Sequence, residues 1–106
     1  MSLMVSKQSV FAGNIARLIL WCLDQGYEVT LGEGYDDDGV GHMKGSTHYV
    51  RLGQDLNLFK DGVLLKKSED YKRAGDAWKA LHPLNRWGGD FPADGNHFSM
   101  LHDGRA

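Results

Sequence analysis

Residues 52–65, LGQDLNLFKDGVLL, predict a β-hairpin at the centre of the fold. Apolar and polar side chains alternate over residues 54–59, which is the period of a strand with one buried face. Residues 60–62 carry a hairpin turn signal, and residues 63–65 begin the return strand. The alternation separates two faces of the first strand, with Asp55 and Asn57 on one and Leu56 and Leu58 on the other.

Two amphipathic helices are expected on either side of this hairpin. Ser68 can cap the second helix, which continues over residues 71–81 until Pro83 stops it. The first helix spans about residues 6–25 and ends at Gly26. We expect Cys22, the last of its apolar residues, to be buried in the core. These apolar residues recur at helical spacing and are Phe11, Ile15, Leu18, Ile19 and Cys22.

Two further strands and two loops complete the predicted elements. Residues 27–31 alternate like a half-buried strand, and a short terminal strand is expected around residues 97–101. Residues 32–46 are glycine-rich without periodicity and predict a long loop. Residues 85–96 predict a second glycine-containing loop.

The composition fits one compact domain. A length of 106 residues leaves no room for a second core, and 42% hydrophobic residues is ordinary for a globular chain. A net charge of −2 with mixed signs argues against nucleic acid as a partner, and no apolar segment approaches the length of a membrane span. We find no secretory signal, so synthesis in the cytoplasm is expected. Residues 1–3 look like an expression remnant, which leaves 4–106 as the domain.

Three residues have the chemistry of a catalytic zinc site, namely His48, Asp55 and His97. Two imidazoles and one carboxylate are ligands that leave a fourth zinc position open for water. Asp55 lies in an apolar strand, where an unpaired carboxylate is costly and a cation would offset that cost. The alternative is that the histidines are surface residues and the carboxylate is solvated. The odd spacing of His48 and Asp55 places His48 on the turn before the strand.

The segments around these residues resemble a known family. Ser46-Thr47-His48 with Asp55-Leu56-Asn57-Leu58, and Trp87-Gly88-Gly89-Asp90 with Asp94-Gly95-Asn96-His97-Phe98, are similar to the two signature segments of the zinc D-alanyl-D-alanine carboxypeptidase / L-alanyl-D-glutamate endopeptidase family, which includes many phage endolysins. The resemblance implies a zinc peptidase that acts on the stem peptide of bacterial peptidoglycan. It runs through roughly residues 15–100.

The resemblance also implies roles for single residues. His48, Asp55 and His97 would bind Zn²⁺, and Asp94 would be the catalytic base. Ser46 looks like a hydroxyl that orients the substrate. Without the resemblance, Asp94 is equally a loop residue that caps a turn with Gly95. Asp90 competes for the role of base, but its position favours a residue that braces the loop.

Two positions near these segments bear on substrate binding. The family usually has an arginine where this chain has Asp36, so Arg51 or Lys44 is expected to supply the missing positive charge. Trp87 could form a wall of the substrate groove, with plain packing as its alternative.

We therefore expect an α+β fold: a small, mostly antiparallel sheet bears the zinc site, and two main helices pack on its other face. The expected function is an L-Ala–D-Glu endopeptidase of endolysin type, which acts on the cell wall after release from the cell. A D-Ala-D-Ala carboxypeptidase is the alternative with the same chemistry. A non-catalytic wall-binding or phage structural module on this fold is a further alternative, and a metal-free domain of unrelated role is the weakest.

Overall fold

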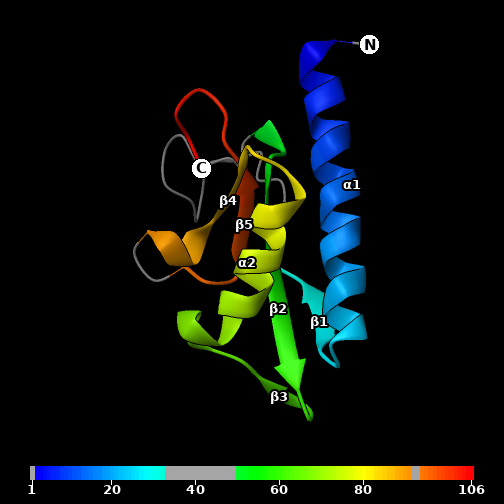
Figure 1. Ribbon diagram of the computed structural model, residues 1–106, viewed down its shortest axis with the longest axis vertical. Coiled ribbons are helices and arrows are strands. Elements are labelled where there is room, and N and C mark those ends of the chain that lie inside the picture. Colours follow the sequence, from blue (N-terminus) through cyan, green and yellow to red (C-terminus); the bar gives the residue numbers. More distant parts are fainter. Residues whose placement is uncertain (1, 33–49, 92–93) are drawn as a thin grey trace.

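The computed structural model describes residues 2–32, 50–91 and 94–106, which form a five-stranded sheet and two α-helices (Figure 1). Two short 3-10 helices, η2 and η3, flank α2. The elements follow one another as α1 (Leu3–Asp24), β1 (Glu28–Leu31), β2 (Gly53–Lys60), β3 (Val63–Leu64), η2 (Ser68–Tyr71), α2 (Lys72–Leu81), β4 (Asn85–Trp87), η3 (Gly88–Asp90) and β5 (His97–Met100).

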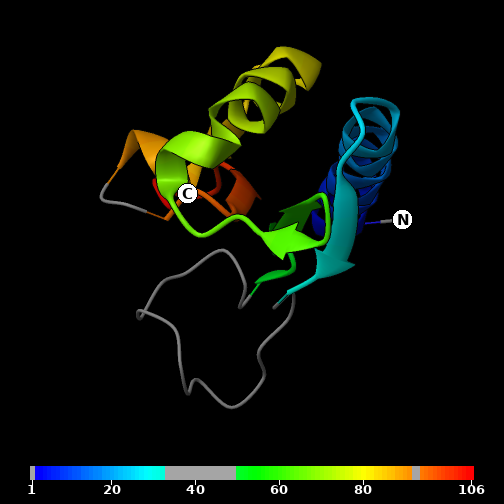
Figure 2. The same cartoon turned by 90° about the horizontal axis from the view of Figure 1, so that it is seen from below.

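The sheet is antiparallel throughout and is organised around β2. The strand order is β1-β2-β5-β4, and β3 also pairs with β2. One edge of β2 pairs with β1, while its other edge pairs with β5 near the start of β2 and with β3 near its end. Seen from below, α1 and α2 lie on the same side of the strands (Figure 2). The predicted α+β fold, with two helices packed on a small antiparallel sheet, is confirmed.

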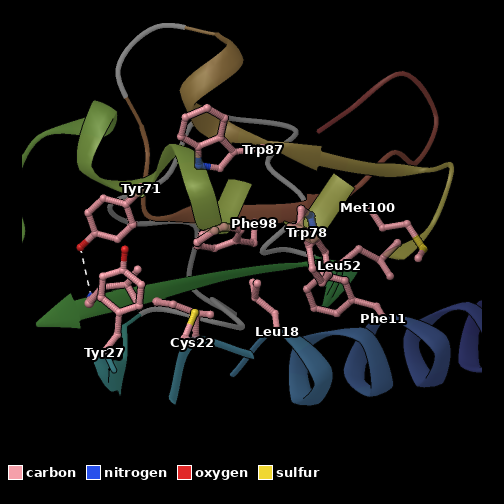
Figure 3. Packing of buried hydrophobic residues seen from close by; sticks show 13 residues of the cluster. Phe11, Leu18, Cys22, Tyr27, Leu52, Tyr71, Trp78, Trp87, Phe98 and Met100 are labelled. Carbon is pink, nitrogen blue, oxygen red and sulfur yellow. Dashed lines mark hydrogen bonds between the residues drawn. The ribbon is translucent and has the colours of Figure 1, made fainter. Parts of the chain in front are cut away.

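The core fills the space between the helices and the sheet (Figure 3). Trp78 of α2 lies at its centre, fully buried, and its ring meets Phe11 of α1 and Phe98 of β5 edge to face. The Trp78 Nε1–H group donates to the carbonyls of Arg86 at 2.9 Å and Ser99 at 3.0 Å. One side chain therefore ties α2 to both β4 and β5.

The first helix and its cysteine agree with the expected pattern. The buried residues of α1 recur every three or four positions as Phe11, Asn14, Leu18 and Cys22. Cys22 is fully buried, and desolvation raises the pKa of its thiol to about 11. The helix begins earlier than expected, at Leu3, because the Ser2 side chain accepts a hydrogen bond from the backbone of Val5 and caps it. Residues 2 and 3 thus take part in the helix.

The expectation of a continuous loop over residues 85–96 is wrong. Residues 85–87 form β4, which pairs with β5 so that Trp87 lies opposite Phe98. The glycines that follow belong to η3 rather than to an irregular loop. Within the described parts of the chain, no helix combines the length and the apolar character needed to cross a bilayer.

Gly75 of α2 gives a direct test of the packing between this helix and β4. A Cβ added at Gly75 would overlap the ring of Trp87. We expect Gly75→Ala to lower the free energy of unfolding by about 1–3 kcal/mol, because this overlap outweighs the gain of about 0.5–1 kcal/mol that alanine brings to a helix.

Gly13 of α1 is the matched control, since a Cβ there would meet only the end of the Arg17 side chain, at 3.3 Å. Urea unfolding of both variants measures the difference. Equal stabilisation by Gly75→Ala and Gly13→Ala would contradict the packing.

Candidate functional site

A carboxylate and an imidazole meet on the sheet face away from the helices. Asp55 of β2 and His97 of β5 are direct partners in the antiparallel register. Cross-strand partners project to the same face, and the neighbouring side chains Leu56 and Phe98 are buried on the helix side. His97 Nδ1 lies 3.2 Å from Asp55 Oδ1, and the exposed fractions of the two side chains are 6% and 21%.

Two glycines let the chain pass close to this pair. A Cβ on Gly32 would lie 2.9 Å from the Asp55 Cβ, and a Cβ on Gly88 would lie 2.9 Å from the His97 Cβ. The Cβ added at Gly88 would also overlap the Asp94 carbonyl oxygen. Any larger residue at either position would force the pair or the neighbouring turn to move.

The turn from Asp94 to His97 is held by hydrogen bonds from three parts of the fold. Gly95 donates its N–H to the Ser68 hydroxyl at 2.9 Å and accepts from Trp87 Nε1 at 2.7 Å. The Asn96 carbonyl accepts from the backbone of Leu56 at 2.9 Å, and the Asp94 carbonyl accepts from His97 N–H at 3.1 Å. Asp94 therefore sits on a braced turn next to the Asp55–His97 pair.

A polar hollow borders this turn at the edge of β2, where its pairing changes from β5 to β3. Its volume is about 230 Å³. Tyr71 closes it on the helix side: its hydroxyl donates to the Leu65 carbonyl, and burial raises its pKa. The lining residues are Asn57, Leu64, Leu65, Lys66, Ser68, Tyr71, Asp94, Gly95 and Asn96.

The structure brings together three of the predicted site residues, Asp55, His97 and Asp94. His48 and Ser46 lie outside the described residues, as do Asp36 and Lys44. Among the residues that are described, no three acidic, histidine or cysteine side chains form a cluster suited to a metal ion. The described part of the site thus contains two of the three predicted metal ligands.

The structure corrects one predicted substrate contact. Trp87 is 5% exposed and packs on the helix side of the sheet against α2, so it is a core residue rather than the wall of an open groove. Arg51 lines a hollow against α1 with Gln8 and Phe11, and it is not among the residues that line the hollow beside Asp94. Whether Arg51 supplies the missing positive charge stays a prediction, because Asp36 lies outside the described residues.

Asp90 has the bracing position that its sequence context suggested. Its carboxylate accepts a hydrogen bond from Lys79 Nζ at 2.7 Å, which links η3 to α2. Lys79 also lies 5.8 Å from the centre of the Trp87 ring. Asp90 therefore belongs to the packing of η3.

Sequence reasoning missed two contributors to the site. Ser68 was expected to cap a helix, but its hydroxyl accepts from Gly95, 27 positions away. Asn57 shares the face of Asp55, and this alternation was a signal for its role; its Oδ1 accepts from Asn96 Nδ2 at 3.2 Å. Local sequence gives no signal for the contact between Ser68 and Gly95.

Comparison with known proteins finds a likeness in fold. The structure is similar to the crystal structure of the L-Ala D-Glu endopeptidase ChiX of Serratia marcescens, with a TM-score of 0.63 and 19% sequence identity. The likeness covers 84% of this chain and 79% of that chain. No family model and no curated protein matches the sequence.

The hydrogen bond from Trp87 Nε1 to the Gly95 carbonyl makes the turn at Asp94 testable. We expect Trp87→Phe to lower the free energy of unfolding by about 1–3 kcal/mol, because it leaves a buried carbonyl without its donor. Trp21→Phe is the control, since the partly buried Trp21 ring contacts Arg73 from the surface of α1. Urea unfolding compares the two variants, and a loss in Trp87→Phe no larger than in Trp21→Phe would refute the bracing role.

Proposed function

We propose that this chain is a zinc-dependent peptidase that cleaves the bond between L-alanine and D-glutamate in the stem peptide of the bacterial cell wall. The observation that carries the proposal is the pair of Asp55 and His97 on one face of the sheet, with Asp94 on the turn that leads into His97. The fold that the chain shares with an L-Ala D-Glu endopeptidase supports the same conclusion.

The Asp55–His97 pair fits a zinc ion in geometry and in donor type. Two donors bound to one tetrahedral zinc ion at about 2.0–2.1 Å each lie about 3.3 Å apart. His97 Nδ1 and Asp55 Oδ1 are 3.2 Å apart, in direct hydrogen-bond contact, so a bound zinc ion would take the place of this hydrogen bond with little change in their separation. His48 is the proposed third ligand, which completes a set of two imidazoles and one carboxylate with room for water.

The chain's own residues divide the remaining work. Bound zinc would lower the pKa of water, so that hydroxide is available near neutral pH. The Asp94 carboxylate takes the proton from the attacking water and delivers it to the leaving amine. The hydrogen bonds of Gly95 and Asn96 hold Asp94 in place, so little reorganisation is needed when substrate binds. Ser46 would orient the substrate.

The proposed site of action is the cell wall, which the protein would reach after synthesis in the cytoplasm. The substrate bond distinguishes this proposal from a D-Ala-D-Ala carboxypeptidase. Incubation with purified peptidoglycan, followed by mass identification of the new amino terminus, separates the two activities. A terminus on D-glutamate is expected, whereas release of free D-alanine would favour the carboxypeptidase.

Metal analysis of the purified protein tests the zinc site. We expect about one zinc ion per chain. Removal of an outer-shell partner lowers metal affinity by roughly 10- to 100-fold, and we expect His97→Ala or Asp55→Ala to lower the affinity for zinc by more than this. His102→Ala is the control, because His102 lies in the C-terminal turn beside Lys7. Zinc content that is unchanged in His97→Ala would overturn the assignment of this ligand.

Asp94→Asn tests the proposed base separately from the metal. The amide cannot accept the proton, so we expect turnover of the stem peptide to fall by about 10²- to 10⁴-fold while zinc content and stability are retained. Asp90→Asn is the control, since this carboxylate contacts Lys79 instead of facing the hollow. Turnover in Asp94→Asn equal to that of the wild type would remove Asp94 from the mechanism. No turnover in any form, with zinc bound, would favour the non-catalytic module.

A further inference from the structure

The polar hollow beside Asp94 contains hydrogen-bond donors that the packing of the protein does not use. The Ser68 hydroxyl accepts from Gly95, so its own proton is available to a ligand. Asn57 also lines the hollow, and because its side-chain oxygen accepts from Asn96, its amide group remains as a further donor. Both groups can donate to the same small anion.

Lys66 adds a positive charge to this lining. Its side chain is exposed, and no acidic residue within 2–32, 50–91 or 94–106 forms an ion pair with it. The one acidic residue in the lining is Asp94, on the braced turn. A cation with two neutral donors and room for a few heavy atoms is suited to a carboxylate.

The hollow lies close to the proposed site of bond cleavage. Asn57 follows Asp55 by two residues on the same face of β2, a separation of about 7 Å along a strand. Asp94 contributes both to the hollow and to the turn that carries His97. A group bound in the hollow is therefore within about one residue of a peptide bond held at the Asp55–His97 pair.

We infer that this hollow is the subsite for the free carboxylate of the acidic residue on the amine side of the cleaved bond, with Lys66 as its charge partner. The inference rests on the proposed function, since that function supplies an acidic residue at this position of the substrate. Lys66 is thus a further candidate for the missing positive charge, beside Arg51 and Lys44. Asn57 and Ser68 fix the orientation of the carboxylate.

Three variants and two substrates test this assignment. Lys66→Gln removes the charge, Lys66→Arg keeps it, and Lys67→Gln removes the charge of a neighbour that does not line the hollow. Each protein is assayed on a stem peptide with the free carboxylate and on the same peptide with a carboxamide in its place. Steady-state kinetics then separate KM from kcat for each pair.

We expect Lys66→Gln to lower kcat/KM on the carboxylate peptide by about 10-fold or more, mainly through KM, because a charge-assisted hydrogen bond is lost. The carboxamide peptide is affected much less, Lys66→Arg restores most of the rate, and Lys67→Gln matches the wild type. An equal loss on both peptides, or no loss on either, would overturn the assignment.

A binding measurement keeps this test separate from the proposed function. The dipeptide L-Ala–D-Glu is titrated into the metal-free protein, and amide chemical shifts of Ser68 and Gly95 report binding. Weaker binding to Lys66→Gln than to Lys67→Gln supports the subsite even if no bond is cleaved, in which case the proposed activity fails alone. Equal binding to both variants overturns the subsite, whatever the activity.

Discussion

The register between β2 and β5 places Asp55 opposite His97, and the other features of the site depend on it. Side chains alternate along a strand, so a slip of one residue would turn Asp55 toward the helices and Leu56 away from them. The core prevents such a slip, because Leu56 and Phe98 are fully buried and Phe98 packs against Trp78. Apolar packing on one face of the sheet thereby fixes the positions of the polar groups on the other.

The same reasoning explains which parts of the fold the sequence could predict. The alternation over 54–59 placed Asp55 and Asn57 on one face, and the helical spacing of residues such as Leu18 identified the buried side of α1. β4 was missed because its three residues are too few to show a period and glycines follow them. The position of Trp87 was missed because it depends on Gly75, a contact between two separate elements that leaves no local pattern.

The described half of the site combines a rigid turn with an accessible hollow. Gly95 is bonded through both its N–H and its carbonyl, so the position of Asp94 is set by η2 and β4 rather than by its own loop. The hollow beside it is lined by polar side chains such as Asn57 and Ser68 and by the positively charged Lys66. In the proposed enzyme such an arrangement would separate two tasks, since the turn would position the proton acceptor and the hollow would select the substrate.

The coordination of bound zinc tests the central claim most directly, and X-ray absorption at the zinc edge measures it. The account predicts nitrogen and oxygen ligands at about 2.0–2.1 Å, with outer-shell scattering from two imidazole rings that falls to one ring in His97→Ala. A sulfur ligand at about 2.3 Å, which would have to come from Cys22, would contradict it. A spectrum without imidazole scattering would contradict it equally.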